Sequence, residues 1–159
     1  MGFQPVAKRA LENQGRVVRF FRGNAPVMAK QPSEVSQYLL AVVIRIFEQC
    51  GGKIERIGDT DMARAAAKVQ AAARTVGLIP ADASFPEKVR SVSDRAQPHI
   101  LDEALHALFE REERKEQEVE MAQDQAALVF LLLWAATEAM DAAWRSPSAP
   151  TWEATAGGA

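Results

Sequence analysis

The sequence predicts an all-α protein: a small helical bundle with a long C-terminal helix and extended N- and C-terminal arms. Alanine is abundant and runs of β-branched residues are short, which favours helix over strand. Apolar residues recur at intervals of three and four over long stretches, the spacing of amphipathic helices. Hydrophobic residues make up 48% of the 159 residues and charged residues 25%, as in globular domains. We expect a basic N-terminal arm at 1–32, a helical domain at 33–145 and a Ser/Pro/Ala/Gly-rich tail at 146–159.

Charge is divided unequally along the chain. Residues 1–31 contain six basic residues and one acidic residue, a net charge of +5. Residues 102–159 contain four basic and twelve acidic residues, a net charge of −8. The whole chain carries only −2, so any attraction to nucleic acid must be local. A basic arm and an acidic distal half indicate contacts with other molecules at the ends of the chain.

The basic arm contains an amphipathic segment at 7–21, interrupted by Gly15 and followed by a break at 23–26. Its cations alternate with apolar residues, a composition that fits four environments: a nucleic-acid strand, another protein, a membrane surface, or the chain's own core. We expect another protein chain as the main partner and nucleic acid as the alternative. The candidate contact residues are Arg16, Arg19, Phe20, Phe21 and Arg22.

The first strong helix is predicted from Ser33, as N-cap, to Gln49, before the glycine pair at 51–52. Its polar residues form one narrow stripe, and almost every other position is apolar. A helix that is apolar nearly all round is typical of the centre of a core. We therefore expect this helix to be the central one.

Three shorter elements follow. A brief alternation at 53–57 predicts a short strand. Asp59 or Thr60 is expected to cap a helix at 61–76, closed by Gly77. A proline near the start predicts a further short helix from Phe85 to about residue 96.

The longest helical pattern covers residues 99–144, with one apolar stripe at three- and four-residue spacing. A highly charged segment at 110–118 interrupts the stripe. The pattern is compatible with one helix or with two helices that separate near Gln117. Neither glycine nor proline marks a break, so we predict a single helix.

The apolar run at 126–136 is about half the roughly 20 residues that a bilayer requires, and we expect no transmembrane segment. Apolar side chains surround the helix here, so one internal core is expected to cover only part of them, with a second chain covering the rest. The candidate contact residues are Phe130, Leu133 and Trp134, and Trp152 is a further candidate in the tail.

Catalytic and metal-binding patterns are weak. His99, Glu103, His106 and Glu110 share one face of a predicted helix, but metal sites of this type take ligands from several helices. We therefore expect no metal site and no cofactor. Cys50, the single cysteine, follows an apolar run and is expected to be a buried structural thiol in a reducing compartment. No phosphate-binding loop or nucleophile motif is present in the sequence, and we expect no enzymatic activity.

These patterns predict a non-enzymatic structural or interaction subunit of a larger assembly. A phage or virion component, or an accessory subunit of a bacterial or organellar complex, fits this description. The subunit would dock through its basic arm and its apolar C-terminal helix. The alternative is a nucleic-acid-binding accessory protein that uses residues 8–30. The expected location is intracellular, cytoplasmic or within a virion, with the mitochondrion as an alternative because the arm is rich in arginine and poor in acids.

Overall fold

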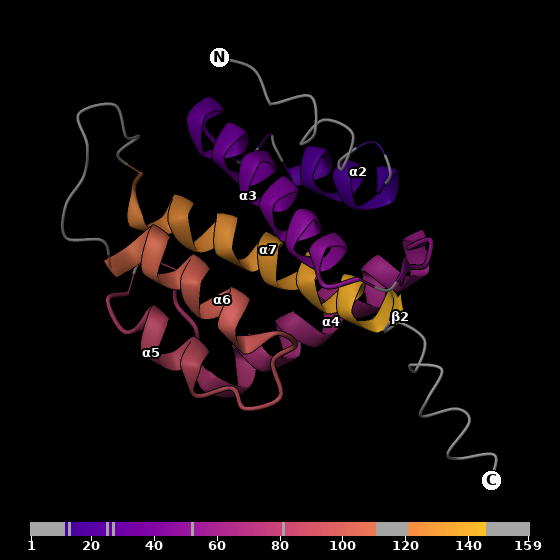
Figure 1. Ribbon diagram of the computed structural model, residues 1–159. Coiled ribbons are helices and arrows are strands. Elements are labelled where there is room, and N and C mark those ends of the chain that lie inside the picture. Colours follow the sequence, from indigo (N-terminus) through magenta and orange to yellow (C-terminus); the bar gives the residue numbers. More distant parts are fainter. Residues whose placement is uncertain are drawn as a thin grey trace, which may run out of the picture.

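The computed structural model describes residues 12, 14–24, 26, 28–51, 53–80, 82–110 and 121–145. These residues form helices and one two-stranded ribbon, so the predicted all-α class is confirmed (Figure 1). The elements are α2 (Gly15–Asn24), α3 (Lys30–Gln49), β1 (Lys53–Ile54), α4 (Asp59–Val76), α5 (Phe85–Arg90), α6 (Pro98–Leu105), the π-helical turn η2 (His106–Glu110), α7 (Gln123–Ala143) and β2 (Trp144–Arg145).

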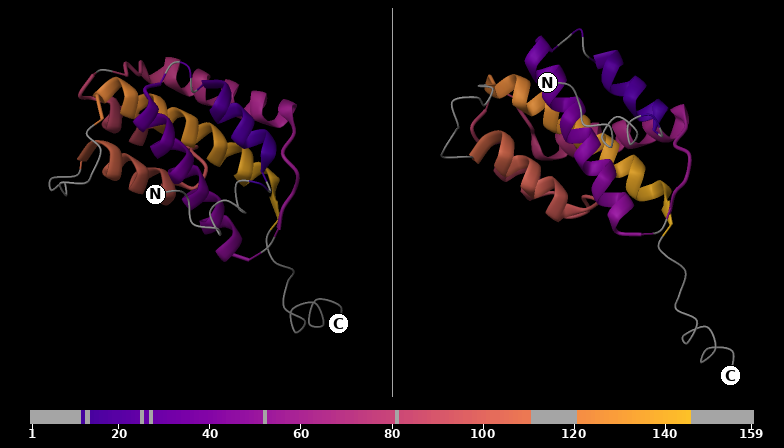
Figure 2. Two further views of the ribbon diagram at one scale, coloured as in Figure 1. Left: turned by 90° about the horizontal axis from the view of Figure 1, so that it is seen from above. Right: turned by 45° about the horizontal axis from the view of Figure 1, so that its top comes forward.

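The central element is α7, and α3, α4, α6 and η2 pack around it (Figure 1). The backbone N–H of Ala29, before α3, donates to Gln125 Oε1 at the start of α7 (3.1 Å). At the other end, Trp144 Nε1 donates to the Gly51 carbonyl (3.1 Å). Because these bonds join start to start and end to end, α3 and α7 run in the same direction. Figure 2 shows both helices from two further sides.

The core is centred on α7 rather than on the helix at 33–49, which corrects the prediction. Every residue from Leu132 to Met140 is buried. Within the apolar run at 126–136, only Leu128 and Leu131 remain partly exposed. Helices of the same chain therefore cover this run apart from these two side chains, which is more than the sequence analysis expected.

The helix α3 is buried on one face only. Leu40, Val43, Ile44 and Phe47 are buried in the core, whereas Tyr38 remains 56% exposed. The helix also starts earlier than predicted, at Lys30, because Ala29 takes the N-cap position. Ser33 lies inside the first turns, where its carbonyl accepts a hydrogen bond from the Ser36 hydroxyl (2.7 Å).

Part of the predicted arm belongs to the folded core. The helix α2 packs against α3 and α4 and buries Val17, Val18 and Phe21. For these side chains the structure matches the own-core alternative. Gly23, in the predicted break at 23–26, lies in the last turn of α2.

The helix α4 ends where the sequence predicted. Gly77 adopts the left-handed conformation (φ 67°), and the Leu78 N–H donates back to the Ala73 carbonyl (2.9 Å). The start differs from the prediction, because Gly58 is the N-cap and its N–H donates to Asp61 Oδ2 (2.8 Å). Alanines on α4 leave room for close packing against α7.

Residues 99–144 do not form one helix, which corrects the prediction. Gln97, just before α6, donates to Asp141 Oδ1 near the end of α7 (2.8 Å), while η2 also packs against α7. The segment formed by α6 and η2 therefore lies beside α7, and the chain reverses between them (Figure 1). Residues 111–120, which include the predicted break at Gln117, lie outside the described residues. Burial of two apolar faces against each other outweighs the absence of a helix-breaking residue.

The remaining elements are short. The predicted strand at 53–57 is reduced to β1, which pairs antiparallel with β2 in the register Lys53 to Arg145 and Ile54 to Trp144. The predicted helix from Phe85 ends at Arg90 as α5. The tail at 146–159 lies outside the described residues.

One helix in the described ranges, α7, is long and apolar enough by length and composition to cross a membrane. It has 21 residues, and its most apolar window has a mean hydropathy of 1.6. Inside the fold, 72% of that window is buried against other parts of the chain.

Replacing Ile44 by Asp should abolish cooperative folding. A buried charge without a partner costs several kcal/mol, against a total stability of about 5–15 kcal/mol. The matched control is Val42→Asp on the same helix, which should keep a cooperative transition because Val42 is 38% exposed. Thermal unfolding followed by circular dichroism measures both. An Ile44→Asp protein that melts within a few degrees of the wild type would refute this assignment of the core.

Candidate functional site

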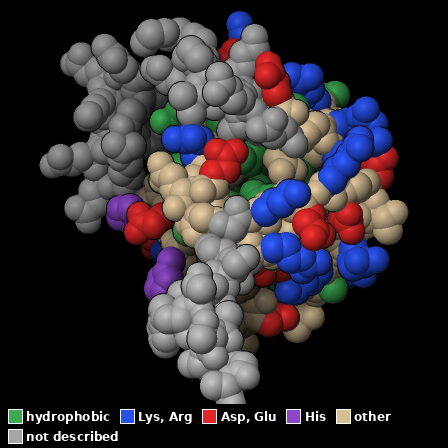
Figure 3. Space-filling model, turned by 45° about the vertical axis from the view of Figure 1, so that its right-hand side comes forward, with side chains coloured by type: hydrophobic (Ala, Val, Ile, Leu, Met, Phe, Trp, Pro, Cys, Tyr) green, Lys and Arg blue, Asp and Glu red, His purple; other side chains and the backbone are tan. Residues whose placement is uncertain are grey.

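The predicted contact residues of the basic arm have different environments. Arg19 and Arg22 are exposed on α2, and Arg16 forms an ion pair with Asp59 (3.0 Å). Phe20 is half-buried, whereas Phe21 is buried in the core. Figure 3 shows Lys and Arg side chains gathered on one side of the molecule, with acidic side chains among them. The arm thus presents arginines to solvent but not the aromatic pair.

The candidates on the C-terminal helix are not available at the surface. Phe130, Leu133 and Trp134 are buried, and the ring of Phe130 packs tilted against that of Trp134 with centroids 6.1 Å apart. The folded chain does not present them to a partner, so their assignment to a partner surface is not kept. Trp152 lies outside the described residues.

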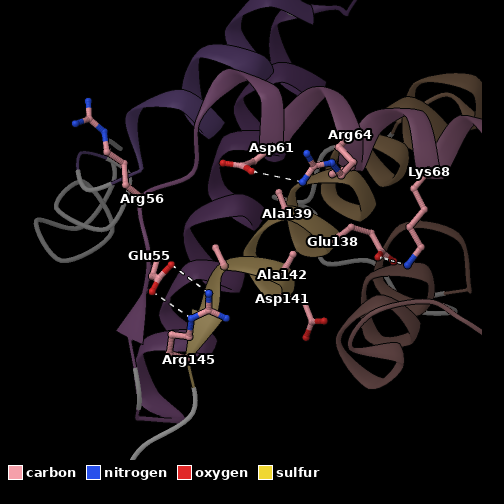
Figure 4. A pocket seen from close by; sticks show the side chains of 12 residues that line it. Glu55, Arg56, Asp61, Arg64, Lys68, Glu138, Ala139, Asp141, Ala142 and Arg145 are labelled. Carbon is pink, nitrogen blue, oxygen red and sulfur yellow. Dashed lines mark hydrogen bonds and ion pairs between the residues drawn. The ribbon is translucent and has the colours of Figure 1, made fainter.

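A groove of about 380 Å³ lies between α4, the end of α7 and the ribbon (Figure 4). Small side chains of α7 form part of its wall, and charged side chains form the rest. The lining residues are Glu55, Arg56, Asp61, Arg64, Ala65, Lys68, Glu138, Ala139, Asp141, Ala142, Ala143 and Arg145.

The charges of the groove are largely paired with one another. Lys68 Nζ lies 2.7 Å from Glu138 Oε1, and Arg145 Nε lies 3.1 Å from Glu55 Oε1. Arg64 lies 4.0 Å from Asp61, at the limit of an ion pair. Four cations and four carboxylates therefore line the groove without a net charge. This arrangement provides no strong attraction for a phosphate or another anion.

Glu138 is the residue of this region that the sequence analysis overlooked. Its buried carboxylate accepts three hydrogen bonds: from Lys68 Nζ on α4 (2.7 Å), from the Ala96 N–H before α6 (2.8 Å) and from Trp134 Nε1 on its own helix (3.1 Å). The sequence signal was an acid inside an otherwise apolar helix, four residues after a tryptophan. Because its carboxylate is already bonded by three donors, Glu138 is suited to joining three segments rather than to acid–base chemistry.

The described lining of the groove contains carboxylates, cations and alanines. No serine, threonine, cysteine or histidine is among its described lining residues, so none of them can supply a nucleophile of these types. Cys50, predicted to be a buried structural thiol, is instead exposed just after α3.

The histidine and glutamate face at 99–110 does not converge on a metal site. Within the described ranges, no group of three or more His, Cys, Asp or Glu side chains is placed to hold a metal ion. His99, Glu103 and His106 are exposed. Glu110 is bound by the Arg90 guanidinium, whose hydrogen bonds hold the pKa of that carboxyl below its usual value.

The outer face of α3 is the most distinctive surface, and the sequence analysis missed it. Five apolar residues at helical spacing form a band that we name the outer stripe: Val35, Tyr38, Leu39, Val42 and Ile46. Tyr38 and Val42 are exposed along its middle, and the other three are half-buried. The signal was present in the sequence as a helix that is apolar nearly all round. That pattern predicts complete burial, whereas the core uses only one face of α3.

The Lys68–Glu138 pair predicts a change in stability at alkaline pH. The hydrogen bond to Glu138 raises the pKa of Lys68 above its ordinary value of 10.5. A raised folded-state pKa contributes stability below pH 10.5, which is lost as the pH rises through the folded-state value. The melting-temperature difference between the wild type and Lys68→Met should therefore shrink as pH rises above this range.

Thermal unfolding from about pH 8 to pH 11.5 measures this difference. Lys53→Met, which removes an exposed lysine that is not bonded to Glu138, is the matched control and should not reproduce the effect. A melting-temperature difference between the wild type and Lys68→Met that stays constant over the whole pH range would contradict a stabilising Lys68–Glu138 pair.

Comparison of the chain with protein-family models, with curated proteins and with solved structures finds no match. Similarity therefore assigns neither a family nor an activity to this protein. Its function has to be inferred from the residues and surfaces described above.

Proposed function

We propose that this protein is a non-enzymatic interaction subunit of a larger protein assembly, and that it docks through the outer stripe of α3. One observation carries the proposal: Tyr38 (56% exposed) and Val42 (38% exposed) lie one turn apart on a helix whose opposite face is already in the core. Single exposed apolar residues are common on proteins, whereas a continuous apolar face marks an interaction surface.

The docking surface differs from the one that the sequence predicted. The apolar side chains of α7 are used inside the fold, so they do not supply a free surface. The outer stripe combines an aromatic residue with aliphatic neighbours, as the centres of protein interfaces do. A non-enzymatic role is supported by the groove, whose described charged side chains mostly bond to one another.

A photo-reactive benzoylphenylalanine at position 42 tests the proposal. In cells that make the protein, irradiation should join this position to another protein chain, which a shifted gel band and mass spectrometry identify. The matched control carries the same group at Gln70, an exposed position on α4. Protein adducts no more abundant at position 42 than at position 70 would refute docking through the outer stripe.

The second candidate is a nucleic-acid-binding accessory protein, favoured by the exposed arginines Arg19 and Arg22 of α2. Burial of Phe21 removes one of the two aromatics that would stack on bases, so phosphate contacts would have to supply the affinity. Protein assembly remains the first proposal because the apolar side chains Tyr38 and Val42 are exposed, whereas Phe21 is buried.

Salt dependence tests the second candidate. If arginines contact phosphates, the affinity for a duplex oligonucleotide should fall with salt, by a slope of about 0.9 per phosphate contacted. The double variant Arg19→Gln/Arg22→Gln should then lower that slope by about 2. Arg74→Gln, on α4, is the control. Binding that is absent at low salt, or that is unchanged in the double variant, would exclude the arginines of α2 as the contact.

A further inference from the structure

We infer that the partner of the outer stripe is a second copy of this chain, and that the two α3 helices pair in antiparallel orientation. The inference rests on the proposed function, because it names the partner of the same surface. It is carried by the order of apolar and charged residues along α3. When two copies of this helix lie antiparallel, apolar residues face apolar residues and opposite charges face each other.

The outer face of α3 is nearly symmetric about the level of residue 40. In a reversed copy centred there, Tyr38 lies opposite the Val42 position, and Gln31 lies opposite the Gln49 position. Val35 and Ile46 lie near opposite ends of the stripe, so each falls close to the other in the second copy. An aromatic residue thus meets a β-branched one, and polar residues meet at both ends.

The charges beside the stripe determine the orientation. Along α3 they occur in the order Lys30, Glu34, Arg45 and Glu48, and helical spacing places Glu34 and Arg45 on the same edge. A two-fold axis that relates antiparallel helices brings the same edge of both copies together. Glu34 of one copy then lies near Arg45 of the other, and Lys30 near Glu48. Opposite charges meet at every one of these positions.

A parallel pair does not have this property. Its two-fold axis runs along the helices, so the charged edge of one copy faces the apolar edge of the other, which carries Leu39 and Ile46. Charged groups then lie against apolar side chains without partners, which is unfavourable. The sequence order therefore selects the antiparallel pair, in the way that edge charges set orientation in coiled coils.

Among the described residues, Tyr38 and Val42 of the required surface are exposed. The helix α3 lies at the outside of the bundle in the views of Figures 1 and 2, and Glu34 is exposed. Arg45 is 41% exposed and bonds only loosely to Glu48 on its own helix (3.4 Å), so it is free to turn to a partner. A single pair of helices buries less than the roughly 1,200 Å² of a stable interface, so the dimer should depend on concentration.

Charge reversal tests the pairing. Glu34→Lys and Arg45→Glu each replace two attractive contacts of the dimer by two repulsive ones, and each should weaken self-association at least about tenfold. Sedimentation at several concentrations measures the wild type and both variants. Glu103→Lys and Arg74→Glu, which change charge on α6 and α4, are the matched controls.

An equimolar mixture of the two variants should restore association. In the mixed dimer, the lysine introduced at position 34 of one chain faces the glutamate introduced at position 45 of the other. The second contact of that dimer keeps the native Arg45 and Glu34, so both contacts are attractive again. Sedimentation of the mixture measures this recovery at the same total concentration as the single variants.

The orientation is tested through Cys50, the only cysteine, which is exposed beside the end of α3. In the antiparallel dimer the two Cys50 residues are about 30 Å apart along the helices, from a rise of about 1.5 Å per residue. In a parallel dimer they are separated only by the distance between the helices, about 8–10 Å. Spin labels on Cys50 and a pulsed dipolar distance measurement separate these cases.

The outcomes distinguish this inference from the proposed function. Circular dichroism first confirms that every variant is folded. Wild-type protein that stays monomeric up to millimolar concentration overturns self-pairing, and so does a mixture that fails to associate or a short distance between labels. If position 42 still forms adducts with a different protein, the proposed function stands while self-pairing fails. Adducts between two copies at position 42, restored association in the mixture and the long distance support both.

Discussion

The structure depends on one constraint: α7 is apolar on every side and has to be covered on every side. A buried Leu, Val or Phe side chain contributes about 1.5–3 kcal/mol relative to the exposed state. The helices α3, α4 and α6 and the turn η2 surround α7 and bury it from residue 132 to residue 140. The arrangement explains why a chain with this C-terminal pattern folds back on itself after α6 rather than extending as one long helix.

A single buried acidic residue of α7 bonds to α4 and to the segment before α6. Glu138 is buried near the end of α7, and an ionised carboxylate there is unfavourable without hydrogen bonds. Its three donors come from α4, from the segment before α6 and from α7 itself. The acid therefore joins the elements that have to meet and sets their register along α7. The charged groove is the exposed side of this network, which accounts for the pairing of its charges.

The surface available to a partner is formed by apolar side chains that lie outside the core. The helix α3 lies beside α7, but only one of its apolar faces enters the core. The same division applies to α2, whose Val17 and Phe21 are buried while its arginines face solvent. The outer stripe is therefore the surface on which the assembly proposal rests, and the order of charges beside it indicates the partner.

The all-α class, the positions of α3 and α4, and the end of α4 at Gly77 followed from the sequence alone, because they depend on local periodicity and on left-handed glycine. The tertiary structure decided which helix is central. The sequences of α3 and α7 are both apolar nearly all round, and they do not determine how many other helices pack against each. It also decided that 99–144 reverses, because the gain comes from contact between distant segments. Glu138 and the outer stripe were hidden for the same reason: a buried acid and an exposed apolar face are recognised only when the neighbouring helices are in place.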